Sequence, residues 1–257
     1  MRLWRPPRRL DQGEEASLVE HLEELRQRIF TCLGAVVVAT IVAFVFHRHL
    51  IHWLEQPLPK KHRQLVTFSP GEPFMTSIWV SIWAGALFVM PVILWQVWAF
   101  FIPAFDKSHE RMLKAFVFLS SALLIAGVVF GYFVALPAAV TFLTNYDNNV
   151  YTVLIRARDY ISFATKVLLA MALVFELPVF VVGLTRLGIL TTDKLRHNRR
   201  IGYFIVACIG VALPGVDPVT TIFETIPLAI LYEVSIWLSV LLDRRAAQAK
   251  AAAVAGT

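Results

Sequence analysis

The sequence of 257 residues is 58% hydrophobic and only 16% charged, with a formal net charge of +6. Soluble domains of this size usually carry about 25% charged residues, and the apolar residues here fall in long runs separated by short charged stretches. This pattern excludes an ordinary water-soluble domain and predicts an all-α polytopic membrane protein. Cys32 and Cys208 lie inside apolar runs without a CxxC partner, so neither a disulfide framework nor a zinc site is expected.

The N-terminal segment predicts a charged tail followed by an amphipathic helix. Residues 1–16 form the tail, and Ser17 with Glu20 three residues later fits a capping box that starts a helix over 17–28. Leucines at spacings of three and four give this helix one apolar face, while the other face carries several carboxylates, including Glu24. Helices that lie on anionic membranes favour Lys and Arg, whereas carboxylates pair with guanidinium groups. A membrane-surface helix and a site for a cationic partner both fit this segment.

Six apolar runs follow and are expected to cross the membrane: 29–46, 74–105, 115–140, 161–182, 201–213 and 222–242. The fifth run would span only about 20 Å as a helix, against a hydrocarbon core of about 30 Å, and helices five and six are both expected to be short. The six-helix domain therefore covers 17–243, and the small polar residues 244–257 are expected to form a disordered cytoplasmic tail.

The basic residues predict the orientation of the six helices. When the loops are assigned alternately to two sides, 17 of the 24 Lys and Arg residues fall on the side of the termini and 6 on the other, with Lys166 inside a run. Because basic loops stay in the cytoplasm, both termini are expected there. If residues 201–213 did not cross, the basic tail would lie outside, so the charge bias favours six crossings.

Three glutamates, Glu176, Glu224 and Glu233, lie inside the apolar runs. A carboxylate at the centre of a transmembrane helix costs about 2.5–3.5 kcal/mol on insertion scales, which makes each a functional candidate. P-loop, HExxH and GxSxG signatures are absent, so neither an enzyme nor a cofactor site is predicted. Two classes remain: a binding and translocation component, and a proton- or ion-coupled transporter of small solutes that uses Glu176. The sequence shows no inverted repeat, which counts against the transporter.

Six segments in order along residues 17–243 resemble the TatC family, the multispanning receptor subunit of the twin-arginine protein translocase. They are LVEHLEELRQRI, FSPGEPFMTSIWVSIW, MPVILWQVWAFFIPAF, GYFVALPAAVTFL, FELPVF and RLGILTTDKLRHNRR. The resemblance implies a receptor in the bacterial plasma membrane for signal peptides with two adjacent arginines, with no cofactor and no nucleic acid. The implied partners are the single-span subunits TatA and, in many systems, TatB. Together they would form an oligomeric translocase that moves folded proteins at the expense of the proton-motive force.

The resemblance also implies roles for particular residues. The signal-peptide-binding residues would be Glu24, Arg26, Phe100, Lys107 and Glu110. The residues implied in transport or partner binding are Pro57, Glu176, Asp217 and Thr221. The sequence departs from the family in the loop before Glu110, which has one extra residue, in LPGVD where the family usually has Thr-Pro-Pro-Asp, and in Thr221, where it often has Gln. Glu224 has no family counterpart.

Overall fold

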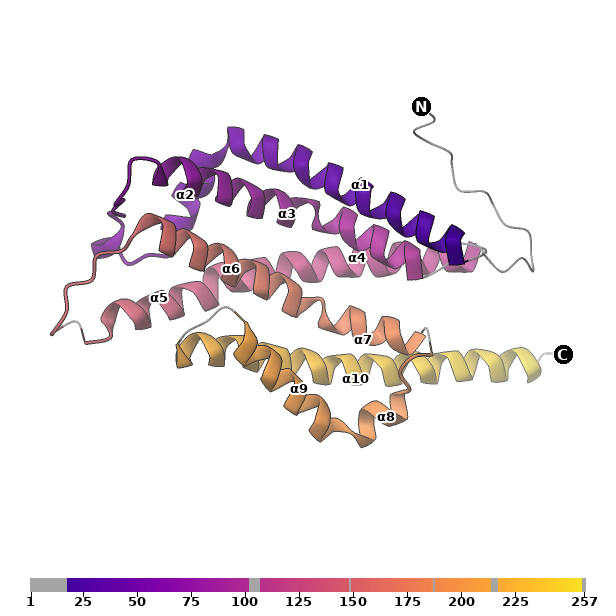
Figure 1. Ribbon diagram of the computed structural model, residues 1–257. Helices are drawn as coiled ribbons and strands as arrows, with labels where there is room; N and C mark the ends of the chain where they lie inside the picture. Colours follow the sequence, from indigo (N-terminus) through magenta and orange to yellow (C-terminus); the bar gives the residue numbers. More distant parts are fainter. Residues whose placement is uncertain (1–17, 102–106, 148, 187, 214–216, 256–257) are drawn as a thin grey trace, which may run out of the picture.

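The computed structural model describes residues 18–101, 107–147, 149–186, 188–213 and 217–255, which form one bundle of helices (Figure 1). The elements are α1 (Leu18–Val45), α2 (His47–Glu55), the 3-10 turn η1 (Lys60–His62), α3 (Glu72–Phe101), α4 (Lys107–Phe130), the π-helix η2 (Gly131–Ala135), α5 (Leu136–Asn145), α6 (Ala157–Phe175), α7 (Leu177–Arg186), α8 (Thr192–His197), α9 (Arg199–Ala212) and α10 (Pro218–Ala255). Apart from one isolated bridge between Val66 and Arg156, the described residues contain no strand. The prediction of an all-α protein is confirmed.

Five segments of the described chain are long and apolar enough to cross a membrane: Leu22–Val45, Glu72–Phe100, Lys114–Asn145, Ala157–Arg186 and Pro218–Arg244. The helix α9, with 14 residues, is about 21 Å long, so the prediction of a short fifth helix is confirmed. Figure 1 shows that α9 still carries the chain from α8 back toward the start of α10, so that α1 begins and α10 ends at the same end of the bundle. This is the arrangement that six passes require.

Two helices are longer than the sequence predicts. The 28 residues of α1 form one continuous helix that joins the expected amphipathic segment to the first apolar run. The last helix, α10, has 38 residues and continues through the segment expected to be disordered as far as Ala255, so it is not short. Residues 244–255 are rich in Ala, Arg, Gln and Lys, which are strong helix formers. A helix already nucleated by the apolar run therefore extends over them readily.

Glycines set how closely several helices approach. A Cβ atom at Gly85 would lie 2.7 Å from the backbone nitrogen of Thr40, where α1 packs along α3. At Gly210 it would lie 2.2 Å from Oγ1 of Thr225, where α9 packs along α10. Membrane helices commonly associate through small residues that let their backbones come together. The glycines therefore hold the outer helix α1 and the last hairpin against the bundle.

A charged pair joins two connections at the end of the bundle that holds η1. Nε of Arg156 donates to Oε1 of Glu72 at 2.8 Å and Nη2 donates to Oε2 at 3.1 Å. The backbone NH of Val66 donates to the carbonyl of Ile155 at 3.0 Å beside this pair. The hydrogen bond to Glu72 raises the pKa of the Arg156 guanidinium. The pair ties the connection before α3 to the one before α6, and so fixes the spacing of these two helices at this end.

Candidate functional site

Glu24 lies in the second turn of α1 and is bound by an arginine of the same helix. Nη2 of Arg28 donates to Oε1 of Glu24 at 2.6 Å, and Nε donates to the same oxygen at 3.0 Å. The spacing of four residues places the two side chains on one helix face. Oε2 of Glu24 takes no part in these two bonds, and the side chain of Glu24 is 39% exposed. One carboxylate oxygen thus holds a guanidinium group while the other is not engaged by Arg28.

Arg28 also fixes this carboxylate against α3. Its Nη1 donates to Oε1 of Gln96 at 2.8 Å, and its Nη2 donates to the carbonyl of Ala99 at 3.3 Å. Sequence reasoning missed Gln96 and the role of Arg28. Gln96 could have been found because it is a single amide in an otherwise apolar segment. Such a group needs a polar partner inside a membrane.

Among the other residues implied in signal-peptide binding, the structure places Arg26 apart from Glu24. Arg26 is directed toward Glu23, with 3.8 Å between Nη1 and Oε1, and its guanidinium lies 5.8 Å from the ring centroid of Phe30. Phe100 follows Ala99 in the last turn of α3, so its backbone adjoins the carbonyl that Arg28 binds. The structure therefore places the backbone of Phe100 next to the Arg28 contact but turns Arg26 to another face of α1.

Lys107 and Glu110 stand in the first turn of α4, and their side chains lie outside the described residues. The start of α4 lies at the same end of the bundle as the start of α1 and the end of α3 (Figure 1). The backbone therefore places Glu110 at the end of the bundle that carries Glu24, as the resemblance implies.

Glu176 stands where the fourth membrane segment is interrupted between α6 and α7. Pro178 has no backbone NH to donate to the carbonyl of Val174, and the NH of Glu176 donates to the carbonyl of Leu173 at 3.1 Å. The side chain is 1% exposed, and neither of its oxygens makes a hydrogen bond of standard geometry. The hydroxyl of Ser120 on α4 lies close enough to act on it electrostatically. The break thus holds a buried carboxylate at mid-helix, well away from the Glu24 site along the chain.

Asp217 caps the N-terminus of α10. Its Oδ1 accepts a hydrogen bond from the backbone NH of Thr220 at 2.8 Å, and its Oδ2 accepts one from the hydroxyl of Thr220. The hydroxyl of Thr221 donates to the backbone carbonyl of Asp217 at 3.1 Å. With Pro218 at the first helical position, this is a standard helix start. Two of the residues implied in partner binding therefore stabilise the local backbone.

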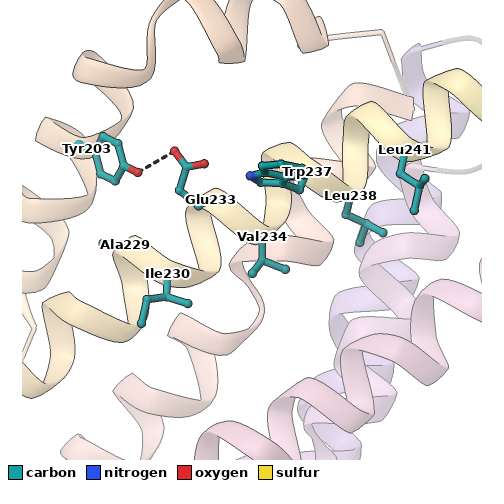
Figure 2. A pocket seen from close by; sticks show the side chains of 8 residues that line it. All are labelled: Tyr203, Ala229, Ile230, Glu233, Val234, Trp237, Leu238 and Leu241. Atoms are coloured by element: carbon teal, nitrogen blue, oxygen red, sulfur yellow. Dashed lines mark hydrogen bonds between the residues drawn. The ribbon is translucent and has the colours of Figure 1, made fainter.

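Three further positions singled out from the sequence lie outside the Glu24 site. Glu224, two turns into α10, is 0% exposed and its two oxygens have no hydrogen-bond partner. Pro57 lies half-buried in the turn after α2. Figure 2 shows Glu233 of α10 facing Tyr203 of α9, whose hydroxyl donates to Oε1 at 2.6 Å; Arg199 Nη1 lies 3.5 Å from the same oxygen. Of the two glutamates, only Glu233 has its carboxylate paired within the described residues.

Within the described residues, no three His, Cys, Asp or Glu side chains come together as a bound metal ion would require. The membrane-spanning helices alternate in direction, and carboxylates lie at one end of the bundle and inside it. These features define the protein as an all-α polytopic membrane protein.

Comparison with known proteins places the chain more closely. The family profile described as Sec-independent protein translocase protein (TatC) matches residues 20–227. The sequence is 34% identical to TatC of Carboxydothermus hydrogenoformans over 89% of this chain and 94% of that protein. It is 32% identical to TatCd of Bacillus subtilis over 94% of this chain and 99% of that protein. A chloroplastic relative from Arabidopsis thaliana is 35% identical over 91% of this chain and 69% of its own length.

The solved structures agree with the sequence relatives. The crystal structure of a twin-arginine translocase receptor, TatC, in dodecyl maltoside superposes with a TM-score of 0.77 at 32% identity, covering 85% of this chain and 99% of that one. The chain belongs to the TatC family. It is a multi-pass membrane component of the Sec-independent protein translocase and not an enzyme, and the resemblance found from the sequence is confirmed.

Proposed function

We propose that this chain is the receptor of a twin-arginine translocase, binding Arg-Arg signal peptides through Glu24 and Glu110 and supporting export of folded proteins driven by the proton-motive force. The observation that carries the proposal is the pairing of Glu24 with Arg28, in which the carboxylate already binds a guanidinium fork through one oxygen. A carboxylate that binds one guanidinium has the geometry to bind another.

The arrangement around Glu24 favours arginine over lysine. Arg28 is held by Gln96 and the Ala99 carbonyl, so it keeps Glu24 oriented while Oε2 remains the acceptor for an incoming guanidinium group. A planar guanidinium satisfies two acceptors at once, whereas an ammonium group is a point charge. The carboxylate of Glu110, at the same end of the bundle, would take the second arginine, with Phe100 and Lys107 beside it. Arg26, on a different face of α1, would add to the charge of this end.

The proposal includes an orientation and partners. Both termini lie in the cytoplasm of a bacterial cell, so that Glu24 and Glu110 meet the signal peptide before transport. TatA and, where it exists, TatB are the single-span partners in the plasma membrane. The excess of basic residues on the side of the termini supports this orientation.

Site-specific photocrosslinking in membranes tests the receptor role. A probe beside Glu24 or Glu110 is offered an Arg-Arg signal peptide or the same peptide with Lys-Lys. We expect adducts with Arg-Arg alone, lost in Glu24→Ala and in Glu110→Ala. Glu23→Ala is the matched control, because it removes a neighbouring carboxylate that pairs with Arg26 instead. Equal labelling by both peptides would reduce the site to general electrostatics and contradict the proposal.

The second class considered from the sequence, a proton- or ion-coupled transporter of small solutes, would depend on Glu176. Family membership over most of the chain removes its main support. The receptor and the transporter still make different predictions. For a receptor, signal-peptide adducts in Glu176→Gln should match those of the unmodified protein. A solute transporter would keep its activity in Glu24→Ala.

A further inference from the structure

A groove of about 620 Å³ runs along the membrane face between α2, α3 and α4, away from the Glu24 site and from the carboxylates inside the bundle. Its walls are apolar and aromatic and include Trp53, Trp83, Phe88, Leu124 and Leu168. Its volume falls within the range of small-molecule sites in proteins, about 300–1,000 Å³. The hydroxyl of Thr165, which also lines it, is satisfied by the carbonyl of Ile161 at 2.7 Å. The groove can therefore hold an apolar ligand without leaving the Thr165 hydroxyl without a hydrogen-bond acceptor.

The length of the groove matches one leaflet of a bilayer. Along α3 its lining extends from Val80 to Phe88, and along α4 and η2 from Leu124 to Phe133. At 1.5 Å per residue these stretches are about 12 and 13 Å long. Half of a hydrocarbon core is about 15 Å. The groove thus has about the length of one leaflet, and its Gln56 end lies at the connection between the first two membrane segments.

The surface end of the groove is basic. Gln56 lines it there, and Nη2 of Arg63 donates to the carbonyl of Gln56 at 3.0 Å. Tyr132, another lining residue, donates its hydroxyl to the carbonyl of Trp53 at 2.8 Å, and Arg63 acts on it electrostatically. Lys60 and Lys61 are exposed beside Arg63. Glu55, at the end of α2, is the acidic residue nearest in sequence, so positive charge prevails at this end.

We propose that the groove binds an anionic phospholipid, with one acyl chain between α3 and α4 and the phosphate at residues 60–63. An acyl chain extends through a single leaflet, which matches the length of the groove, whereas a partner's transmembrane helix is 10–12 Å wide and crosses both leaflets. Trp53 belongs to the connection between the first two membrane segments, and the Tyr132 hydroxyl binds its carbonyl. Tryptophan and tyrosine are the side chains enriched at membrane surfaces. The π-helix η2 carries Tyr132 and Phe133 into the wall, and such helices are frequent at functional sites.

Two variants separate the acyl-chain site from the headgroup site. Ala84→Phe fills the groove, with Val38→Phe on the exposed face of α1 as the matched control. Lys60→Ser with Lys61→Ser removes two positive charges at its surface end. Lys194→Ser with Arg200→Ser removes the same charge from two exposed positions at the other end of the bundle. None of these positions belongs to the proposed signal-peptide site.

Native mass spectrometry of the purified full chain, offered phosphatidylglycerol or phosphatidylcholine, measures the binding. We expect one tightly retained phosphatidylglycerol, preferred by about fivefold for each lysine near the surface. Ala84→Phe should abolish retention of both lipids, and the lysine pair should abolish only the preference. Equal retention of the two lipids by the unmodified protein, or retention unchanged in Ala84→Phe, would overturn the proposal.

A photoreactive residue in place of Phe88 identifies the occupant in cell membranes. Phe88 is 84% exposed and lines the groove on α3, so its replacement should leave folding intact. We expect adducts with phospholipid that decrease when Ala84→Phe is added. Adducts with a protein instead would assign the groove to a partner helix and overturn the proposal. Export measured on the same variants is independent of this result, so failure here leaves the receptor role to its own test.

Discussion

Carboxylates in this protein are held in sharply different ways, although each appears in the sequence as a Glu or Asp next to apolar residues. Glu24 binds Arg28, Asp217 caps α10, and Glu176 is buried at a helix break without a hydrogen-bond partner. The sequence pattern identifies Glu24 on the amphipathic segment and Glu176 in an apolar run, where acidic residues are rare, whereas Asp217 is a candidate only through the family resemblance. Only the contacts separate a helix cap from a binding group.

The helix cap at Asp217 can be tested against a role in partner binding. Asp217→Ala should lower the free energy of unfolding by about 1 kcal/mol, because the NH of Thr220 loses its acceptor. Asp217→Asn should retain most of the stability, since Asn caps helices about as well. Thermal unfolding in detergent measures both, and export measures function. Normal stability with lost export in Asp217→Asn would show that the carboxylate does more than cap.

The pair of Arg156 and Glu72 gives a second prediction at this scale. Because Glu72 is buried, Arg156→Ala should lower the melting temperature more than the double variant Arg156→Gln with Glu72→Gln, which leaves no unpaired charge. The pKa of Arg156 is raised by Glu72, so the stability this arginine contributes is present below its ordinary pKa and lost only as pH rises through the raised value. Arg156 should therefore add no pH dependence between pH 6 and about 9. Equal melting temperatures of the two variants would contradict this account.

At the scale of helices, the close packing of α9 against α10 depends on two glycines, because they have no Cβ atom. A Cβ at Gly202 would lie 1.9 Å from the hydroxyl of Tyr232, and one at Gly210 would lie 2.2 Å from Oγ1 of Thr225. The two glycines of α9 face these two residues of α10, so the glycines set the distance between the helices.

Gly210→Ala should therefore destabilise the protein by about 1–3 kcal/mol, the usual cost of overpacking. Adding Thr225→Ala should restore part of the loss, because it removes the atom that the new Cβ meets. Gly34→Ala is the control: nothing lies within 4 Å of its Cβ position, and alanine is the better helix former. A similar loss in both glycine variants, measured by thermal unfolding, would exclude packing as the cause.

The membrane helices were predictable from the sequence, whereas helix ends and the short helices α2 and α8 between the apolar runs were not. The apolar runs gave the membrane segments because length and hydropathy suffice for that purpose. Helix ends depend on helix stop signals, which the period of the apolar residues does not show. Without such a signal the amphipathic segment continues into the first apolar run, and α10 continues to Ala255. In the candidate site, Glu24 was predicted from its charge. Its bond to Arg28 and the part played by Gln96 needed the packing of α1 on α3.

At the scale of the whole molecule, the question is whether the short helix α9 crosses the membrane. Single cysteines in a protein carrying Cys32→Ser and Cys208→Ser answer it with a membrane-impermeant maleimide. Lys61→Cys and Val219→Cys should react in intact cells, and Lys194→Cys only after the membrane is opened, because α9 separates positions 194 and 219. Reaction of Val219→Cys only after opening would place α10's start inside and contradict six crossings.

The continuity of α1 has a mechanical consequence. A straight rod of 28 residues is about 42 Å long, and its apolar stretch is not buried by the rest of the protein. With α3 as its main support, a tilt of roughly 5° about the midpoint would carry each end about 2 Å in opposite directions. Glu24 and Val45 would then move as the two arms of a lever. Spin labels at Gln27 and Val42, each paired with one on α6, would register such a tilt as distance changes of opposite sign.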